Sequence, residues 1–260
     1  MNARVSITVA DHVADVRLTR PDKMNAIDLP MFEEIAATIA QLGDMPGVRA
    51  VVLSGEGRGF CAGLDMMSMA DGGAGLDVAT RSHGIANLVQ QVAWGWRTLP
   101  MPVIAAVHGV ALGGGFQILS GADIRIAAPA TRFAIRETYW GLVPDMAGVA
   151  LWRGLARDDV LRELTYTARE FETEEALRLG FVTHVSDDPH RVALALAVQI
   201  AGRNPEAIRA SKRLFNLAMD ADAATILQAE SDEQVAILRR PNQIEAVMAN
   251  MQKRPPVFTD

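Results

Sequence analysis

Two acidic residues within one apolar segment are the first candidates for acid–base chemistry. Glu137 and Asp145 lie in the segment RETYWGLVPDMAG, on either side of Gly141 and Pro144. An apolar environment withholds water from a carboxylate and raises its pKa toward values that suit proton transfer at neutral pH. The two residues could therefore supply a base and an acid, although solvated or helix-capping acids in a loop would give the same pattern.

Two glycine-rich turns, each after a predicted strand, could hold a negatively charged oxygen. They are GEGRGFCAGLD, residues 55–65, and HGVALGGGFQ, residues 108–117. Glycine allows a sharp turn and leaves backbone N–H groups uncovered, and at a helix start those donors have no partner within the helix. Two of them directed at one oxygen would form an oxyanion hole, where one donor contributes about 3 kcal/mol to a transition state. Taken singly, either turn is equally well explained by close packing of a strand and a helix.

Other kinds of site are not favoured. Cys61 is the single cysteine, and its apolar neighbours indicate a packed side chain rather than a nucleophile. The five histidines form no metal-binding pair, so we expect no metal. Phe60 occupies the place of the third glycine in a dinucleotide fingerprint, and the Lys-Ser/Thr ending of a phosphate loop is absent from that turn.

Composition sets the class of protein. The chain has 260 residues, half of them hydrophobic, and a formal net charge of -6. This indicates a globular protein that needs no disulfide, and it argues against nucleic-acid or membrane partners. The uncharged stretch Val103–Ala122 contains glycines and polar residues, which favour a strand, a turn and a helix over a membrane span. A single cysteine and an N-terminus without signal-peptide features lead us to expect a cytoplasmic location.

Hydrophobic periodicity predicts strands that alternate with helices in the first half of the chain, which is typical of an α/β fold with mostly parallel pairing. The expected strands are Val5–Val9, Val13–Leu18, Ala50–Leu53, Val103–Val107 and Ile124–Ala127. The expected helices between them are Met31–Leu42, Thr80–Leu99 and one after the second glycine turn. The segment Met67–Thr80 has little periodicity and is expected to be a mobile loop beside the site.

Helices dominate after about residue 145. They are predicted over Trp152–Thr167, Thr173–Leu179, Pro189–Arg203, Pro205–Met219, Ala221–Arg239 and Asn242–Lys253. We divide the chain into a core of residues 1–200 and a C-terminal helical region of residues 201–260.

Seven motifs in this order resemble the crotonase superfamily, also called the enoyl-CoA hydratase/isomerase family, over nearly the whole chain. They are RPDKMNAID, GRGFCAGLDM, PVIAAVHGVALGGG, GADIRIA, FAIRETYWGLVPDMAG, EALRLGFVTHV and QKRPPVF. The resemblance implies a spiral of ββα repeats with a C-terminal helical trimerisation region, assembled as a homotrimer or homohexamer.

The resemblance also implies an acyl-CoA thioester substrate, with coenzyme A as part of the substrate and no separate cofactor. By position, the N–H groups of Ala62 and Gly114 would be the oxyanion donors that stabilise a thioester enolate. The other residues expected to contact the substrate are Lys23, Asn25, Ala26, Gly63, Leu64, Asp65 and Gln117.

The catalytic positions select among reactions. Hydratases of the family typically have two glutamates, and the chain has Gln117 and Glu137 at those places. A glutamine amide cannot exchange a proton at ordinary pH. Family members that isomerise dienoyl-CoA resemble the chain in having an aspartate at the place of Asp145, although they usually have another aspartate at the place of Gln117.

We therefore favour isomerisation of a dienoyl-CoA by Glu137 and Asp145. The alternatives are hydration of a 2-enoyl-CoA and an acyl-CoA-binding homologue with weak catalysis. Nucleophilic attack by Asp145 on an acyl-CoA ring is also open, because a carboxylate can form a covalent intermediate.

Overall fold

The computed structural model describes residues 3–70 and 76–260, and its central element is a mixed sheet. In the described chain the sheet has the strand order β1-β2-β3-β4-β6-β9. The strands are β1 (Val5–Ala10), β2 (Val13–Leu18), β3 (Ala50–Gly55), β4 (Val103–Val107), β6 (Ile124–Ala127) and β9 (His184–Val185). β1 and β2 form an antiparallel hairpin, and every later pair is parallel. The α/β class predicted from the sequence is confirmed.

A second, smaller sheet was not predicted. It contains β5 (Val110–Leu112), β7 (Arg132–Ala134) and β8 (Phe171–Glu172), in that order. Strands of two or three residues are too short to show a period of two, which explains why the sequence pattern missed them.

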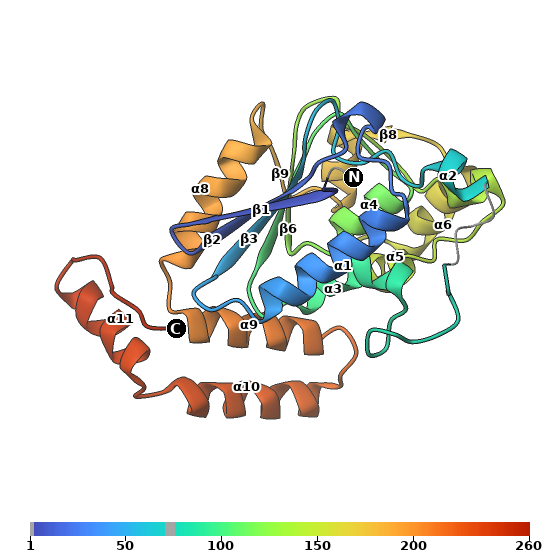
Figure 1. The fold of residues 1–260 in the computed structure, drawn as a ribbon. Coiled ribbons are helices and arrows are strands. Elements are labelled where there is room, and N and C mark those ends of the chain that lie inside the picture. The colour runs from blue at the N-terminus through green and yellow to red at the C-terminus, as the bar shows by residue number, and fades with distance from the viewer. Residues whose placement is uncertain (1–2, 71–75) are drawn as a thin grey trace.

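Helices cover both faces of the large sheet, with α8 (Pro189–Ala201) on one side and α1 (Leu29–Gly43) and α3 (Leu88–Thr98) on the other (Figure 1). The alternation along β4 supplies both cores, because Val103, Ala105 and Val107 join the cluster with α1 and α3, while Ile104 and Ala106 join the cluster with α8. The helix α8 turns alanines toward the sheet, namely Ala193, Ala197 and Ala201. Strands buried on both faces read as continuous apolar runs, which is the pattern of a parallel sheet.

Two helix predictions were wrong at their boundaries. The helix expected over Thr80–Leu99 begins at Leu88, because Asn87 and Gln90 form a capping box there. The single helix expected over Trp152–Thr167 is two helices, α5 (Gly148–Trp152) and α6 (Asp158–Thr167). The expected loop Met67–Thr80 begins inside the short helix α2 (Met66–Ala70), and its residues 71–75 lie outside the described residues.

The remaining helices match their predictions within about two residues. They are α7 (Thr173–Leu179), α9 (Pro205–Leu217), α10 (Ala223–Ile237) and α11 (Pro241–Met251). The helix expected after the second glycine turn, for which no bounds were predicted, is α4 (Gly114–Ser120). Lys212 joins α9 to the core, since its ammonium donates to the carbonyl oxygens of Trp96 and Met101 and to Asp123.

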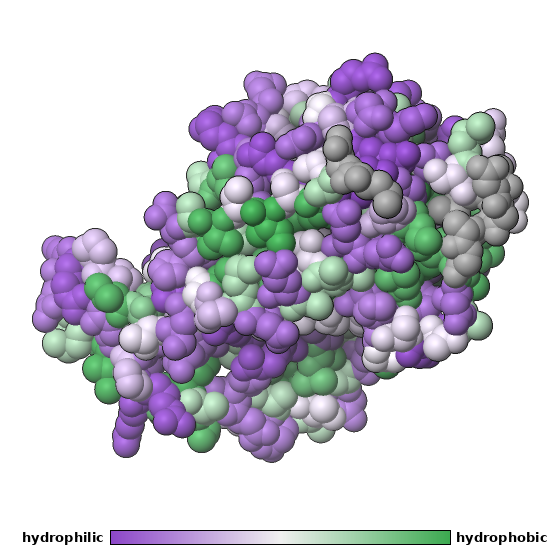
Figure 2. Space-filling model, viewed as in Figure 1, coloured by the Kyte–Doolittle hydropathy of each residue, from purple (hydrophilic) through white to green (hydrophobic). Residues whose placement is uncertain are grey.

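We call α10 and α11 the C-terminal arm, which extends away from the sheet (Figure 1). No residue of α10 is buried in the described chain, and Figure 2 shows hydrophobic residues within the surface of the arm at the lower left. Within the described residues, no helix is both long and apolar enough to span a membrane.

Candidate active site

A cavity of about 160 Å³ brings the two glycine turns and the Glu137 segment together. Its lining includes five of the predicted site residues, namely Ala62, Gly63, Leu64, Gly114 and Glu137. It also includes Met66, Leu112, Gly113, Arg136, Trp140 and Leu142. Arg136 was not among the predicted site residues, and its position directly before Glu137 was the only signal for it.

The two glycine turns approach so closely that side chains would not fit between them. Gly63 has φ +89°, and a β-carbon on it would lie 2.6 Å from the Leu112 carbonyl oxygen and 3.6 Å from the Gly114 nitrogen. A β-carbon on Gly115 would lie 2.4 Å from the Cys61 carbonyl oxygen. These contacts explain why glycine is required at both places.

Among the residues of these turns that line the cavity, Leu64 and Gly114 have backbone N–H groups without a hydrogen-bond acceptor among the described residues. Gly114 is the first residue of α4, so its N–H has no partner within the helix, and Gly113 provides no side-chain cap. Around Leu64, the chain pairs with Ile27 through the Gly63 carbonyl and the Asp65 N–H, which leaves the N–H between them free. Both free donors belong to residues that line the cavity.

The prediction that Ala62 supplies an oxyanion donor is corrected by this geometry. The Ala62 N–H donates to the Met24 carbonyl oxygen at 2.9 Å, so it is already occupied. The free donor lies two residues later, at Leu64. The sequence could not distinguish them, because the pairing of residues 61–65 with residues 24–27 is a long-range contact.

Glu137 begins the 3-10 turn Glu137–Trp140, and only 6% of its surface is exposed. Its Oε1 accepts a hydrogen bond of 2.6 Å from Gln117 Nε2. Its Oε2 is buried without a hydrogen-bond partner among the described residues. Burial raises the pKa of Glu137, and the charge of Asp145 raises it further. A buried carboxylate with one unoccupied oxygen is well suited to take a proton.

Gln117 lies on α4 and is fully buried. Its Oε1 accepts from the backbone N–H groups of Met146 and Gly148, both at 2.9 Å, and its amide nitrogen donates to Glu137. Both ends of the amide are therefore bound to the protein, and the expected contact of Gln117 with substrate stays a prediction.

Asp145 lies outside the cavity lining and is exposed to solvent. Partial desolvation by the surrounding protein still raises its pKa. Its charge acts on Glu137, which indicates that the two predicted carboxylates are near one another. A carboxyl group at the surface can exchange its proton with solvent.

The loop of residues 20–28 is hydrogen-bonded to the first glycine turn of the site. Asn25 is fully buried, accepts from the Arg20 N–H, and donates to the carbonyl oxygens of Glu56 and Gly59. Its side chain thus holds the loops together, and the expected contact of Asn25 with substrate stays a prediction. Lys23 is exposed, and it lies outside the cavity lining, as does the buried Ala26.

Asp65 also contacts the loop of residues 20–28. Its carboxylate pairs with Arg20 at 2.8 Å, and this contact helps to hold the pKa of Asp65 low against the desolvation that would raise it. Arg20 also donates to the Ala26 carbonyl oxygen. Asp65 therefore forms an ion pair directly after the free N–H of Leu64, and its predicted contact with substrate stays a prediction.

Cys61 is packed as predicted. Its thiol donates to the Asn25 carbonyl oxygen at 3.1 Å, and burial raises its pKa to about 12. A thiol with that pKa is not ionised at neutral pH and is a poor nucleophile. In the part of the chain that the structure describes, no group of three or more His, Cys, Asp or Glu residues could hold a metal.

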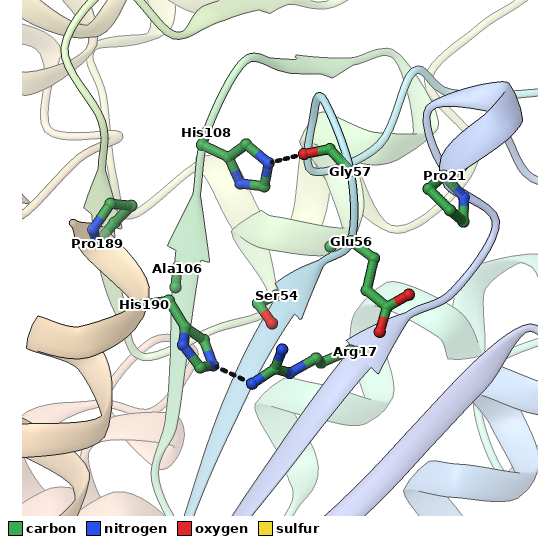
Figure 3. Close-up of a pocket in the computed structure, with 10 residues that line it drawn as sticks. Arg17, Pro21, Ser54, Glu56, Gly57, Ala106, His108, Pro189 and His190 are labelled. Carbon is green, nitrogen blue, oxygen red and sulfur yellow. Dashed lines mark hydrogen bonds between the residues drawn. The ribbon is translucent and has the colours of Figure 1, made fainter. Parts of the chain in front are cut away.

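A second cavity, of about 530 Å³, opens at the carboxyl ends of β2, β3 and β4 beside the start of α8 (Figure 3). Its Arg17 donates to Asp15 at 2.7 Å, and its His190 lies 3.0 Å from the same carboxylate. Asp15 thus pairs with both Arg17 and His190, and none of the predicted site residues lines this cavity. We therefore place the candidate active site in the smaller cavity.

Comparison with known proteins identifies the family. The family model for enoyl-CoA hydratase/isomerase matches residues 8–260. The chain is 31% identical to the mitochondrial Delta(3,5)-Delta(2,4)-dienoyl-CoA isomerase of Mus musculus over 96% of this chain and 80% of that protein. It is 33% identical to the short-chain-enoyl-CoA hydratase of Clostridium acetobutylicum over 93% of this chain and 92% of that protein.

A solved structure shows the same fold. The enoyl-CoA hydratase of Bacillus anthracis superposes with a TM-score of 0.87 at 28% identity, covering 98% of this chain and 99% of that one. The crotonase-like fold expected from the sequence motifs is thereby confirmed. The chain belongs to the enoyl-CoA hydratase/isomerase family of enzymes.

Proposed function

We propose that the chain isomerises a 3,5-dienoyl-CoA to a 2,4-dienoyl-CoA through a thioester enolate. The observation that carries the proposal is the unpartnered Glu137 Oε2 beside the cavity that receives the free N–H groups of Leu64 and Gly114. A base next to an oxyanion hole is what proton removal from the carbon adjacent to a thioester needs.

In the proposed reaction each of the two carboxylates carries out one proton transfer. Glu137 Oε2 takes a proton from C2, the C–H electron pair enters the conjugated system, and the charge that develops on the thioester oxygen is stabilised by the Leu64 and Gly114 donors. Asp145 then gives a proton to C6, and the double bonds shift to positions 2 and 4. Asp145 regains its proton from solvent, to which it is exposed, and Glu137 returns its proton to solvent after product release.

Hydration is less well supported by the site. Addition of water across a double bond by the two-glutamate scheme needs an acid and a base on the same water, and the place of one of them holds Gln117, an amide that cannot exchange a proton. The 33% identity with a short-chain-enoyl-CoA hydratase keeps this reaction as the second candidate.

The test offers a 3,5-dienoyl-CoA and, separately, a 2-enoyl-CoA to the wild type and to Glu137→Gln and Asp145→Asn, and follows the thioester chromophore. We expect conversion of the dienoyl substrate and its loss by at least 100-fold in both variants, the size typical of a missing general base or acid. Hydration of the enoyl substrate that needs Glu137 and tolerates Asp145→Asn would overturn the isomerase. Binding of both esters without turnover would favour the binding homologue.

A further inference from the structure

Glu137 is connected to the turn after Asp145 by a single buried side chain, that of Gln117. The Met146 and Gly148 N–H groups donate to Gln117 Oε1, and Gln117 Nε2 donates to Glu137 Oε1. Because two N–H donors require an oxygen at one end of the amide, the NH₂ group must face Glu137. The orientation of Gln117 is therefore determined by the backbone.

We propose that Gln117 is a positioning residue that selects isomerisation over hydration: it holds Glu137 by Oε1, leaves only Oε2 free for the substrate, and supplies no second acid or base. This inference rests on the proposed function, since it concerns the same base.

Packing around the amide leaves it little freedom. A β-carbon on Gly148 would lie 2.6 Å from Gln117 Oε1, so glycine at that place allows the Gly148 N–H to reach the amide oxygen. A β-carbon on Gly113 would lie 3.4 Å from Glu137 Oε1, so Gly113 lies directly beside that oxygen. Of the two carboxylate oxygens, Oε2 is the one left without a hydrogen bond.

The same side chain relates the two carboxylates of the proposed reaction. Met146 directly follows Asp145, and its N–H is fixed on Gln117 while Glu137 is fixed on the other end of the amide. Gln117 thus links the backbone directly after Asp145 to the Glu137 carboxylate, and loss of its hydrogen bonds would leave two buried N–H groups unsatisfied.

A glutamate at this place would behave differently. One of its oxygens could accept from Met146 and Gly148 as the amide oxygen does, and the other would face Glu137 Oε1 at about the present 2.6 Å. Two carboxylates so close must share a proton, which creates a coupled acid–base pair. Water addition requires a pair of this kind, whereas in the dienoyl reaction the shared proton would occupy the base and weaken its ability to take a proton from the substrate.

The experiment compares the wild type with Gln117→Glu and Gln117→Met, and uses Gln199→Glu on the exposed face of α8 as the matched control. Three quantities are measured: the pH profile of kcat/KM for the 3,5-dienoyl-CoA, the rate of water addition to a 2-enoyl-CoA, and the pKa of Glu137 by carboxyl ¹³C NMR, assigned by its disappearance in Glu137→Gln.

For Gln117→Glu we expect the pKa of the base in the pH profile to rise by at least about one unit, dienoyl turnover at pH 7 to fall at least 10-fold, and water addition to rise at least 10-fold. For Gln117→Met we expect kcat to fall about 100-fold with KM changed less than about threefold, and the NMR pKa of Glu137 to rise because a donor to the carboxylate is lost. The control should match the wild type.

The possible failures are distinguishable. Wild-type protein that converts no dienoyl-CoA would overturn the proposed function and, with it, the selective role of Gln117. Active wild type with an unchanged pH profile and no gain of water addition in Gln117→Glu would overturn the inference alone. If Gln117→Met does not fold, as checked by circular dichroism, Gln117→Glu decides by itself, because it preserves size and shape.

Discussion

Arg20 and Asp65 form an ion pair with 2.8 Å between Nη2 and Oδ2, and Asp65 directly follows the residue whose N–H is a free donor of the candidate site. Arg20 is itself held by the Ala26 carbonyl oxygen and lies 3.6 Å from Asp28. The position of the Leu64 N–H therefore depends on a charged cluster behind the cavity rather than on the glycine turn alone.

We predict that Asp65→Asn lowers kcat about 10- to 100-fold with a smaller effect on KM, because a donor displaced from the oxyanion no longer stabilises the transition state fully. Steady-state kinetics on the proposed dienoyl substrate measure this. Asp187→Asn, at an exposed position, is the control. Kinetics of Asp65→Asn equal to those of the control would show that the ion pair does not position Leu64.

The close approach of the two glycine turns gives a second prediction. Gly63→Ala places a β-carbon 2.6 Å from a backbone oxygen in a left-handed conformation, whereas Gly47→Ala has a similar φ of +78° with no atom within 4 Å. We expect Gly47→Ala to lose about 1 kcal/mol of stability from the backbone conformation and to keep its activity.

Gly63→Ala should lose more stability than this and at least 100-fold in activity, since the clash moves the donor turn. Urea denaturation and kinetics of both variants test the pair. Equal stability and equal activity in the two would mean that the turns can separate without consequence.

The fold could be predicted from the sequence wherever the signal was local. The parallel strands showed as short apolar runs, and α1 was placed by its spacing after Asp28, whose side chain accepts from the Met31 N–H as a cap should. The start of α3 was misplaced, because the capping box formed by Asn87 and Gln90 determines the boundary and was not recognised in the sequence.

The site was predicted in part. Gly114 and Glu137 were found from their motifs, and in the structure both residues line the same cavity. Ala62 was chosen over Leu64 because the acceptor of the Ala62 N–H, the Met24 carbonyl oxygen, comes from another segment. For the same reason the sequence did not show that Asn25 binds Glu56 and that Asp65 binds Arg20. Which polar group is occupied and which is free is a property of tertiary contacts, and no spacing along one segment reports it.

The buried carboxyl group of Glu137 predicts a pH-dependent stability. Burial raises its folded-state pKa, so the folded protein binds this proton more tightly than the unfolded chain. The resulting stabilisation is fully present below the unfolded-state pKa and is lost as the pH rises through the raised folded-state pKa. Glu137→Gln stays neutral at every pH and avoids that loss.

Glu137→Gln should therefore unfold at higher urea concentration than the wild type above the folded-state pKa of Glu137, with the difference shrinking toward pH 4. Denaturation curves at pH 4, 6 and 8 measure this, and Glu174→Gln, on the exposed face of α7, provides the control. A difference that is constant with pH would contradict the assigned ionisation. If Glu137→Gln is more stable than the wild type but inactive, the ionised carboxylate of Glu137 is needed for activity and destabilises the fold.

The exposed apolar side chains of the C-terminal arm predict that the protein forms an oligomer. Its exposed apolar side chains include Leu227 at 62%, Val235 at 75% and Met251 at 76%, and so much exposed apolar surface is unusual for a chain that stays monomeric. We expect a homotrimer or homohexamer, with a mass in light scattering of three or six times 28.0 kDa.

Val235→Asp should shift the protein toward monomer, because a charge would be buried at the interface. Val198→Asp makes the same change at an exposed position of α8 and should leave the mass unaltered. A monomeric wild type, or equal effects of the two variants, would remove the arm from any role in assembly.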